Sequence, residues 1–204
     1  MSTERQALDV SQLPTVVFGH RSKLWWGTAA FMAVETTTLA IFVTSYFYLA
    51  RLRDTWPPDP IPPPDLLPGT LVLIVLLLTV PLEILAKPYG HRMQLRPLLK
   101  FKFASLAATA SAGLLRIWEF RGLNVRWDDN AYGSVVWALL CFHTLLLIVE
   151  VIEEILILGF LAVPSMREPK HFADAEDSGF YQFFLVAVTV VIYLTVYVAP
   201  RLMS

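Results

Sequence analysis

The sequence predicts an all-α membrane protein whose five transmembrane helices form a bundle. Of its 204 residues, 56% are hydrophobic and only 16% are charged, whereas soluble domains carry about 25% charged residues. The apolar residues gather in five runs, each near the roughly 20 residues that a helix needs to cross a bilayer core of about 30 Å. The runs lack the alternation of apolar and polar residues that strands of a membrane barrel require, so helices are favoured.

The five apolar runs lie near residues 24–50, 68–87, 97–119, 132–163 and 178–200. The fourth run is long enough for its helix to tilt or to project from the bilayer. Residues 1–23 are polar and lack the apolar core of a cleavable signal peptide. We therefore divide the chain into a tail over 1–23 and a five-helix domain over 24–204.

Lysine and arginine are distributed unequally between the two ends of the predicted helices. One side collects ten of them: Arg5, Arg21, Lys23, Lys87, Arg92, Arg96, Lys100, Lys102, Arg167 and Lys170. The other side collects five: Arg51, Arg53, Arg121, Arg126 and Arg201. Because the loops of membrane proteins that remain in the cytoplasm carry the positive excess, we predict a cytoplasmic N-terminus and an external C-terminus.

The connection between the first two helices is rich in proline. The stretch WPPDPIPPPDLLPG, residues 56–69, has seven prolines within twelve residues. Proline disrupts helices and donates no hydrogen bond to a sheet, so this stretch predicts an extended, stiff, polyproline-like strap on the outer face. It is either a rigid connector or a docking surface for a partner subunit.

Composition and motifs argue against a redox or nucleic-acid site on this chain. There is no basic run of the nucleic-acid type, no Gly-rich phosphate loop and no Cys–His pair spaced for zinc. Of the four histidines, His143 alone lies deep in a predicted helix. A haem with two axial histidines and a histidine-rich di-iron centre are both disfavoured, and no metal or cofactor is expected to be bound by this chain.

One carboxylate stands inside the first apolar run, in FMAVETTTLAIF. Glu35 is about eleven residues into its helix, or roughly 16 Å along it, close to the bilayer midplane. An ionised group there costs several kcal/mol, so we expect Glu35 to face the bundle and to be protonated. Heptad spacing places on one face Thr28, Phe31, Glu35, Thr38, Phe42 and Ser45. A role in packing and a role in proton handling both remain open.

Three further acids lie in the fourth run, in CFHTLLLIVEVIEEILI. Glu150 and Glu154 share a helix face with His143, and Glu153 lies beside them. Three acids this close cannot all be ionised in lipid. We expect them to form a polar interface that faces water or another subunit, with a metal site from His143, Glu150 and Glu154 as the weaker alternative.

The third run ends with two opposite charges, Arg116 and Glu119. Their spacing of three residues places them side by side on a helix. They are expected to form an ion pair that anchors the end of the helix at the membrane interface.

Several stretches, in order along the chain, are similar to motifs of one family. The run LWWGTAAFMAVETTTLAIFVTSYFYL before WPP has a Trp-rich start, one glutamate and an aromatic-rich end, and LLPGTLVL and LLRIWEF follow. The most specific stretch is DNAYGSVVWALLCFH at 129–143. Together they resemble cytochrome c oxidase subunit III over residues 24–198, in the five-helix form of bacterial members that lack the first two of seven helices.

The resemblance assigns family positions to individual residues. Glu35 matches the family's buried glutamate, and the other polar and structural matches are Glu119, Asp129, Tyr132, Gly133, Ser134, His143 and, more weakly, His171. The chain also departs from the family. Leu146 stands where a second histidine is usual, and Arg116 replaces a common glutamine. Tyr181, Gln182 and Leu185 stand where the last-helix motif has a tryptophan, a histidine and an aspartate. No family counterpart is assigned to Glu150, Glu153 and Glu154.

The resemblance implies a subunit without redox centres in a haem–copper terminal oxidase of a bacterial plasma membrane. Such a subunit packs against catalytic subunit I, which holds haem and copper, and contacts other oxidase subunits. It binds phospholipid in a cleft and supports proton uptake during oxygen reduction in aerobic respiratory electron transport. The family's orientation agrees with the one predicted from the charges.

The sequence also allows other functions. The departures also allow a partner of the related nitric oxide reductase type. A free-standing proton-coupled transporter is a different class, but it is expected to show an internal repeat or broken helices, and the sequence suggests neither. A membrane di-iron enzyme is the weakest alternative, since the clustered histidines are missing.

Overall fold

A computed structural model of the chain describes residues 16–203, which form helices and loops and no strand. Residues 1–15 of the predicted tail, which include Arg5, lie outside the described residues. The helices are η1 (Gly19–Arg21), α1 (Lys23–Arg51), α2 (Leu66–Leu77), α3 (Thr79–His91), α4 (Leu95–Arg121), α5 (Ala131–Ala162), α6 (Lys170–Tyr193), η2 (Leu194–Val198) and α7 (Ala199–Met203). They make five helical rods long and apolar enough to span a membrane. This confirms the predicted all-helical fold with five such helices.

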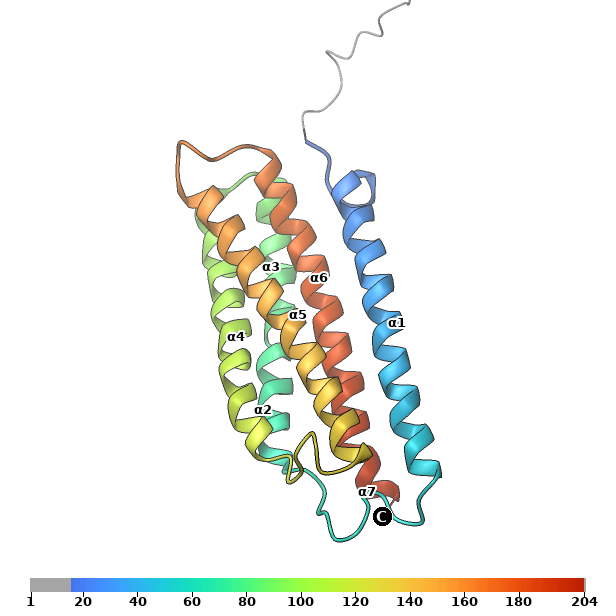
Figure 1. Ribbon diagram of the computed structural model, residues 1–204. Helices are drawn as coiled ribbons and strands as arrows, with labels where there is room; N and C mark the ends of the chain where they lie inside the picture. The colour runs from blue at the N-terminus through green and yellow to red at the C-terminus, as the bar shows by residue number, and fades with distance from the viewer. Residues whose placement is uncertain (1–15, 204) are drawn as a thin grey trace, which may run out of the picture.

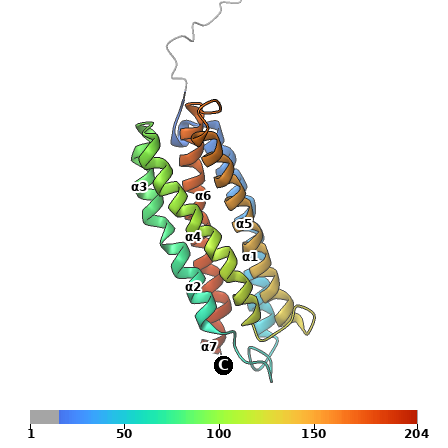
Figure 2. The ribbon, with the colours of Figure 1, turned by 90° about the vertical axis from the view of Figure 1, so that its left-hand side faces the viewer.

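The rods run side by side in an up-and-down bundle (Figure 1). α4 packs against α2, α3 and α5, and α6 packs against α5, α3, α2 and α1. The α3–α4 and α5–α6 connections lie at the same end as the start of α1, and the strap, the α4–α5 connection and the C-terminus lie at the other (Figures 1 and 2). We call these the first end and the second end of the bundle.

α4 shows that the bundle is polar inside and apolar outside. Its buried residues recur every three or four positions: Leu98, Lys102, Ser105, Thr109, Ala112, Arg116 and Glu119. Its outward residues include Phe103 and Leu114, which are 66% and 71% exposed. A membrane helix can expose such side chains because lipid is as apolar as they are. The charged residues in the middle of α4, Lys102, Arg116 and Glu119, turn inward, whereas those near its ends are exposed.

The second rod is broken between α2 and α3. α2 ends at Leu77, and α3 begins at Thr79 with Pro81 in its first turn. Pro81 has no N–H for the carbonyl of Leu77, and its ring crowds that carbonyl. The Thr79 hydroxyl donates to the Leu76 carbonyl at 2.7 Å and itself accepts from the Gln182 amide at 2.8 Å. The break is thus held by side chains, which satisfies buried polar groups.

The fifth rod begins well before the predicted residue 178. α6 begins at Lys170, and one acid of this segment, which sequence alone assigns to a loop, finds partners across the bundle. Glu176 lies 3.1 Å from Lys87 and 2.8 Å from His91, both on α3. Near the C-terminus the helix widens into the π-type turn η2, just before Pro200. A wider turn accommodates the missing N–H of a proline.

The strap is not the straight polyproline segment that the sequence predicts. It bends through residues 53–57, turns at 59–60 and joins α2 at Leu66. Trp56 is buried, with its ring centre 5.3 Å from that of Tyr46 and 5.0 Å from that of Tyr132. Packing of one large aromatic side chain into the core outweighs the preference of the prolines for extended chain. The strap is therefore a folded connector that closes the second end of the bundle.

The start of α5 explains three of the family-matched residues. Asp129 accepts from the Arg126 backbone N–H at 2.8 Å, and the Ser134 hydroxyl donates to the Trp127 carbonyl at 2.8 Å. At Gly133, an added Cβ would lie 2.1 Å from the Arg126 carbonyl oxygen. Only glycine allows the loop to pack this closely on the helix.

Replacing Gly133 with alanine should therefore destabilise the protein by about 1–3 kcal/mol, the usual cost of overpacking. The measurement is the thermal unfolding midpoint of the purified protein in detergent. Gly159 on the same helix is the matched control, because nothing lies within 4 Å of a Cβ added there. Gly159→Ala should leave the midpoint unchanged or raise it. Equal midpoints for the two variants would contradict the prediction.

Candidate functional site

Glu35 lies inside the bundle, as its isolation in an apolar run predicts. It is 4% exposed, and the Tyr181 hydroxyl of α6 lies 2.9 Å and 3.1 Å from its two carboxyl oxygens. The predicted stripe around it is only partly right, because Phe31 is 52% exposed. The hydroxyls of Thr38 and Ser45 donate to carbonyls of their own helix. Tyr181 is thus the polar partner of Glu35, and the protonation of Glu35 stays a prediction.

Glu35→Gln and Glu35→Leu should separate hydrogen bonding from titration at this position. The glutamine oxygen can still accept from Tyr181, so this variant should keep near wild-type stability. The leucine leaves the buried hydroxyl unpaired, at a cost of about 1–3 kcal/mol. Thermal midpoints in detergent measure both, and Tyr181→Phe combined with Glu35→Leu should recover part of the loss. A leucine variant as stable as the glutamine variant would refute this account.

A cluster of four charged residues lies in the bundle interior toward its first end. Lys102 is fully buried, and its ammonium lies 3.0 Å from Glu83 of α3 and 3.0 Å from Glu154 of α5. Ser178 of α6 lies 3.2 Å from the ammonium, and its hydroxyl lies 2.6 Å from Glu154 and 3.1 Å from Glu150. We call these five residues the lysine cluster. It joins four helices around one ammonium group.

The placement of Glu150 and Glu154 corrects the prediction of an outward polar interface. Both are 3% exposed and turn into the bundle, whereas Glu153 between them is exposed. Glu150 and Glu154 are four residues apart and share one helix face. Glu153 is the direct neighbour of Glu154 and is therefore turned by about 100° from it. Lys102 is the physical reason that two acids can enter the core, since a buried carboxylate requires a paired cation or a proton.

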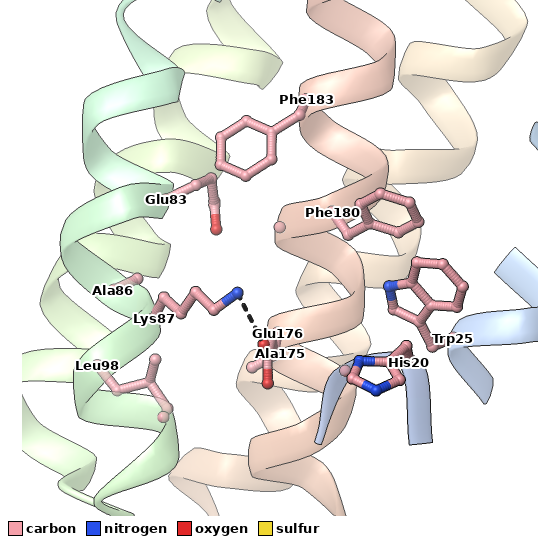
Figure 3. A pocket seen from close by; sticks show the side chains of 13 residues that line it. His20, Trp25, Glu83, Ala86, Lys87, Leu98, Ala175, Glu176, Phe180 and Phe183 are labelled. Carbon is pink, nitrogen blue, oxygen red and sulfur yellow. Dashed lines mark ion pairs between the residues drawn. The ribbon is translucent and has the colours of Figure 1, made fainter. Parts of the chain in front are cut away.

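A cavity of about 230 Å³ lies beside the lysine cluster, between the start of α1, α3 and α6. Figure 3 shows Lys87 and Glu176 paired across it, with Trp25 and Phe180 on the side of α1 and α6. Lys87 is exposed at its rim, and the buried Glu83 forms part of its wall. The same Glu83 carboxylate contacts Lys102. The cavity therefore leads from the first end of the bundle toward the lysine cluster.

Gly179 makes this arrangement possible. A Cβ added at Gly179 would lie 2.6 Å from the Glu83 carboxylate oxygen. The absence of a side chain at this position on α6 lets Glu83 lie flat against the neighbouring helix and reach Lys102. This is a close approach of the kind that favours glycine.

A second network lies nearer the second end of the bundle. Arg116 and Glu119 pair at 2.6 Å, as predicted, but both are 2% exposed. Arg116 also lies 2.7 Å from His143 Nδ1, and the Tyr197 hydroxyl donates to Glu119 at 2.6 Å. The pair is thus part of a buried network and not an anchor at the membrane surface. We call Arg116, Glu119, His143, Thr189 and Tyr197 the arginine network.

His143 belongs to this second network and not to the acid cluster. Its Nε2 lies 2.9 Å from the Thr189 hydroxyl, and its Nδ1 faces Arg116. Glu150 and Glu154 contact the lysine cluster instead, so the structure does not assemble the metal ligands suggested for these three residues. Within residues 16–203, no group of three or more His, Cys, Asp or Glu residues is placed to hold a metal ion.

The remaining predicted residues have local contacts. His171 lies 3.0 Å from Asp174 at the start of α6, and its ring stacks on Phe160. Tyr132 packs in the apolar core with Tyr46 and Trp56, and its buried hydroxyl has no partner among the described residues. Neither residue joins the lysine cluster or the arginine network.

Sequence reasoning missed Glu83, Lys102 and Ser178. Lys102 was expected to be an end charge that reports orientation, but it is buried about two turns inside α4. The lysine and arginine excess on that side persists without it. The sequence does contain a pattern that indicates the buried position of Lys102. From Lys102 to Glu119, small and polar residues recur every three or four positions, which places them on one helix face. Glu83 continues a similar line on α3 from Thr79 to Gly90.

Compared with known proteins, the chain matches no family model and no curated protein. The resemblance to cytochrome c oxidase subunit III therefore rests on the motifs in the sequence.

Proposed function

We propose that this chain is a non-catalytic, subunit III-like membrane subunit of a haem–copper terminal oxidase. In this role it stabilises the catalytic subunit that reduces oxygen and supports that subunit's proton uptake. The order of the motifs across the five helices supports the proposal. The partner would hold the haem and copper, and phospholipid would fill part of the boundary between the subunits.

The observation that supports the proposal is that two family-matched residues from distant motifs lie in one buried network. Glu119 of α4 and His143 of α5 both contact Arg116, which itself stands where the family usually has a glutamine. Glu35 of α1 contacts Tyr181, which stands where the family's last-helix motif usually has a tryptophan. The matched residues Glu35, Glu119 and His143 are therefore all buried, as residues of a shared core would be, and their partners are particular to this chain.

Purification in a mild detergent tests the proposal. The full chain, tagged at its C-terminus, is isolated from membranes of its native host, and its visible spectrum and bound metals are measured. A co-purifying haem spectrum together with copper in the partner chain supports the oxidase subunit. A haem-bearing partner without copper indicates the nitric oxide reductase alternative. Isolation without any haem-bearing partner, at native expression levels and in two detergents, would overturn the proposal.

The Glu35 variants extend this test to function. In the purified complex, Glu35→Gln should keep normal haem absorbance and most proton pumping. The reason is that no continuous line of titratable side chains leads past Glu35 through the described residues. The measurement is the proton-to-electron ratio of the complex in vesicles. Loss of pumping with intact electron transfer would make Glu35 an obligatory proton carrier and contradict this role.

A free-standing proton-coupled transporter is the second candidate, and two observations favour it. Transporters are expected to have broken helices, and the second rod is broken between Leu77 and Thr79, which the sequence did not suggest. The lysine cluster places buried carboxyl groups beside a cavity that lies toward the first end of the bundle. Proton-coupled transporters also use buried carboxyl groups of this kind. The purification separates the two functions, because a transporter is isolated without haem. A transporter would also move protons with a solute when the chain alone is reconstituted into vesicles.

A further inference from the structure

The hydrogen bonds of Lys102 are fully used. An ammonium group has three N–H donors, and here they face Glu83 at 3.0 Å, Glu154 at 3.0 Å and Ser178 at 3.2 Å. Each of these acceptors comes from a different helix, and all are buried. The ammonium therefore has no free donor for Glu150, the third carboxyl of the lysine cluster.

The charges of the lysine cluster do not balance if every group is ionised. Three carboxylates would face one ammonium, and ionised groups without a counter-charge are strongly disfavoured in a buried site. The titratable groups around the cluster include Glu153 of α5, Asp174, Asp177 and Tyr181 of α6, and Glu35 of α1 beyond Tyr181. Lys87 and Glu176 line the cavity beside Glu83. Lys87 is the cation among these groups, and it is paired with Glu176 at 3.1 Å, so it does not offset the excess. At least one carboxyl of the cluster must carry a proton.

The contacts of Ser178 indicate which carboxyl that is. Its oxygen lies 2.6 Å from Glu154 and 3.1 Å from Glu150. A hydroxyl has one proton to donate and two lone pairs to accept with, so it cannot donate to both at once. If Ser178 accepts from Lys102 and donates to Glu154, its remaining lone pair requires a donor. A protonated Glu150 supplies that donor.

The environment of Glu150 agrees with a neutral carboxyl. Its described hydrogen bond is to Ser178, and its second oxygen is buried without a partner, as is one oxygen of Glu154. Glu83 and Glu154 both contact the Lys102 ammonium, whereas no such contact is found for Glu150 among the described residues. Its side chain is 3% exposed and turns into the cluster. If Glu150 were ionised, its second oxygen would be a buried charged acceptor without a hydrogen-bond donor. In a neutral carboxyl the same oxygen is a carbonyl oxygen, and burying it without a donor costs less free energy.

We propose that Glu83, Lys102, Glu150, Glu154 and Ser178 form a proton-binding site that exchanges with bulk water through the cavity beside Glu83. Glu83 takes a proton from water and passes it to Lys102 as Lys102 gives one to Glu154, so Lys102 remains an ammonium. Glu154 then gives its proton to the Ser178 oxygen as Ser178 gives its own proton to Glu150, so Ser178 remains a hydroxyl. That hydroxyl now points toward Glu154, and its rotation back toward Glu150 resets the relay. Each transfer runs along a contact already present.

The site stores a proton near one end of the bundle. Glu83, Lys102, Glu154 and Ser178 each lie about two helical turns, or roughly 11 Å, from the first end, and the described contacts of the cluster end at Glu150. This storage concerns the chain itself and does not depend on an oxidase partner. The purification described above therefore does not test the proton-binding site, which needs an experiment of its own.

Infrared spectroscopy of the purified full chain in lipid nanodiscs tests the site. A protonated carboxyl gives a C=O stretching band apart from that of carboxylates, and the wild-type protein should show one that Glu150→Gln removes. Glu153→Gln is the matched control, because Glu153 lies on the same helix but is exposed, and it should retain the band. Circular dichroism and gel filtration check that both variants fold.

Exchange into D₂O tests the connection to water. The wild-type band should shift as deuterium replaces the proton, and Ser178→Ala should slow this exchange roughly tenfold, the effect of losing one hydrogen bond in the relay. The proposal would be overturned if Glu150→Gln removed no band, or if the band that it removes never exchanged in the wild-type protein. If Glu150→Gln does not fold, the exchange of the wild-type band and its slowing in Ser178→Ala still decide the matter.

Discussion

Replacing Lys102 with methionine is expected to destabilise the protein by about 3–5 kcal/mol, the usual cost of removing one partner of a buried ion pair. Methionine keeps most of the length of the unbranched side chain and removes the charge. Glu83 and Glu154, which both lie 3.0 Å from the Lys102 ammonium, would then be buried without a cation. Part of the loss would be recovered by uptake of protons. The measurement is the thermal unfolding midpoint in detergent, together with the yield of folded protein.

Lys100→Met is the matched control, because Lys100 lies on the same helix but is exposed. It should leave the midpoint near that of the wild type. Adding Glu83→Gln and Glu154→Gln to Lys102→Met should restore much of the lost stability, since the unpaired charges disappear with their cation. If Lys102→Met were as stable as Lys100→Met, the cluster would not support the bundle.

Replacing Arg116 with leucine should have an effect of similar size, about 3–5 kcal/mol. Arg116 contacts Glu119 at 2.6 Å and His143 at 2.7 Å. Without it, the Glu119 carboxylate would be left in the core with only the Tyr197 hydroxyl. Loss of the guanidinium should therefore loosen the contacts of α4 with α5 and α6 together.

Arg121→Leu serves as the control for this variant, since Arg121 ends the same helix and is exposed. Amide hydrogen exchange of α5 and α6 is the most direct readout, with faster exchange expected around His143 and Thr189 in Arg116→Leu alone. Arg116→Leu combined with Glu119→Gln should exchange more slowly than Arg116→Leu. Unchanged exchange in Arg116→Leu would mean that the network carries little stability.

The two networks differ in how far the sequence anticipates them. Arg116 and Glu119 are three residues apart on one helix, so their pairing follows from local geometry. Lys102 meets acids on two other helices, and no local spacing encodes such a meeting. Its position in the sequence, near a predicted helix end, is equally consistent with a charge at the membrane surface. Only the packing of α3, α4, α5 and α6 decides between these two interpretations.

The sequence by itself determined the all-helical fold class, the number of rods long and apolar enough to span a membrane, and the inward position of Glu35. Length and hydropathy decide which helices suit a bilayer, and a lone carboxyl side chain is disfavoured in lipid. Tertiary structure decided which acids of α5 turn inward, where α6 begins and that the strap folds back on Trp56. Outward faces of membrane helices are as apolar as buried ones, so hydropathy does not report which side of a helix faces the bundle. That choice depends on partners such as Lys102, which only the assembled helices bring within reach.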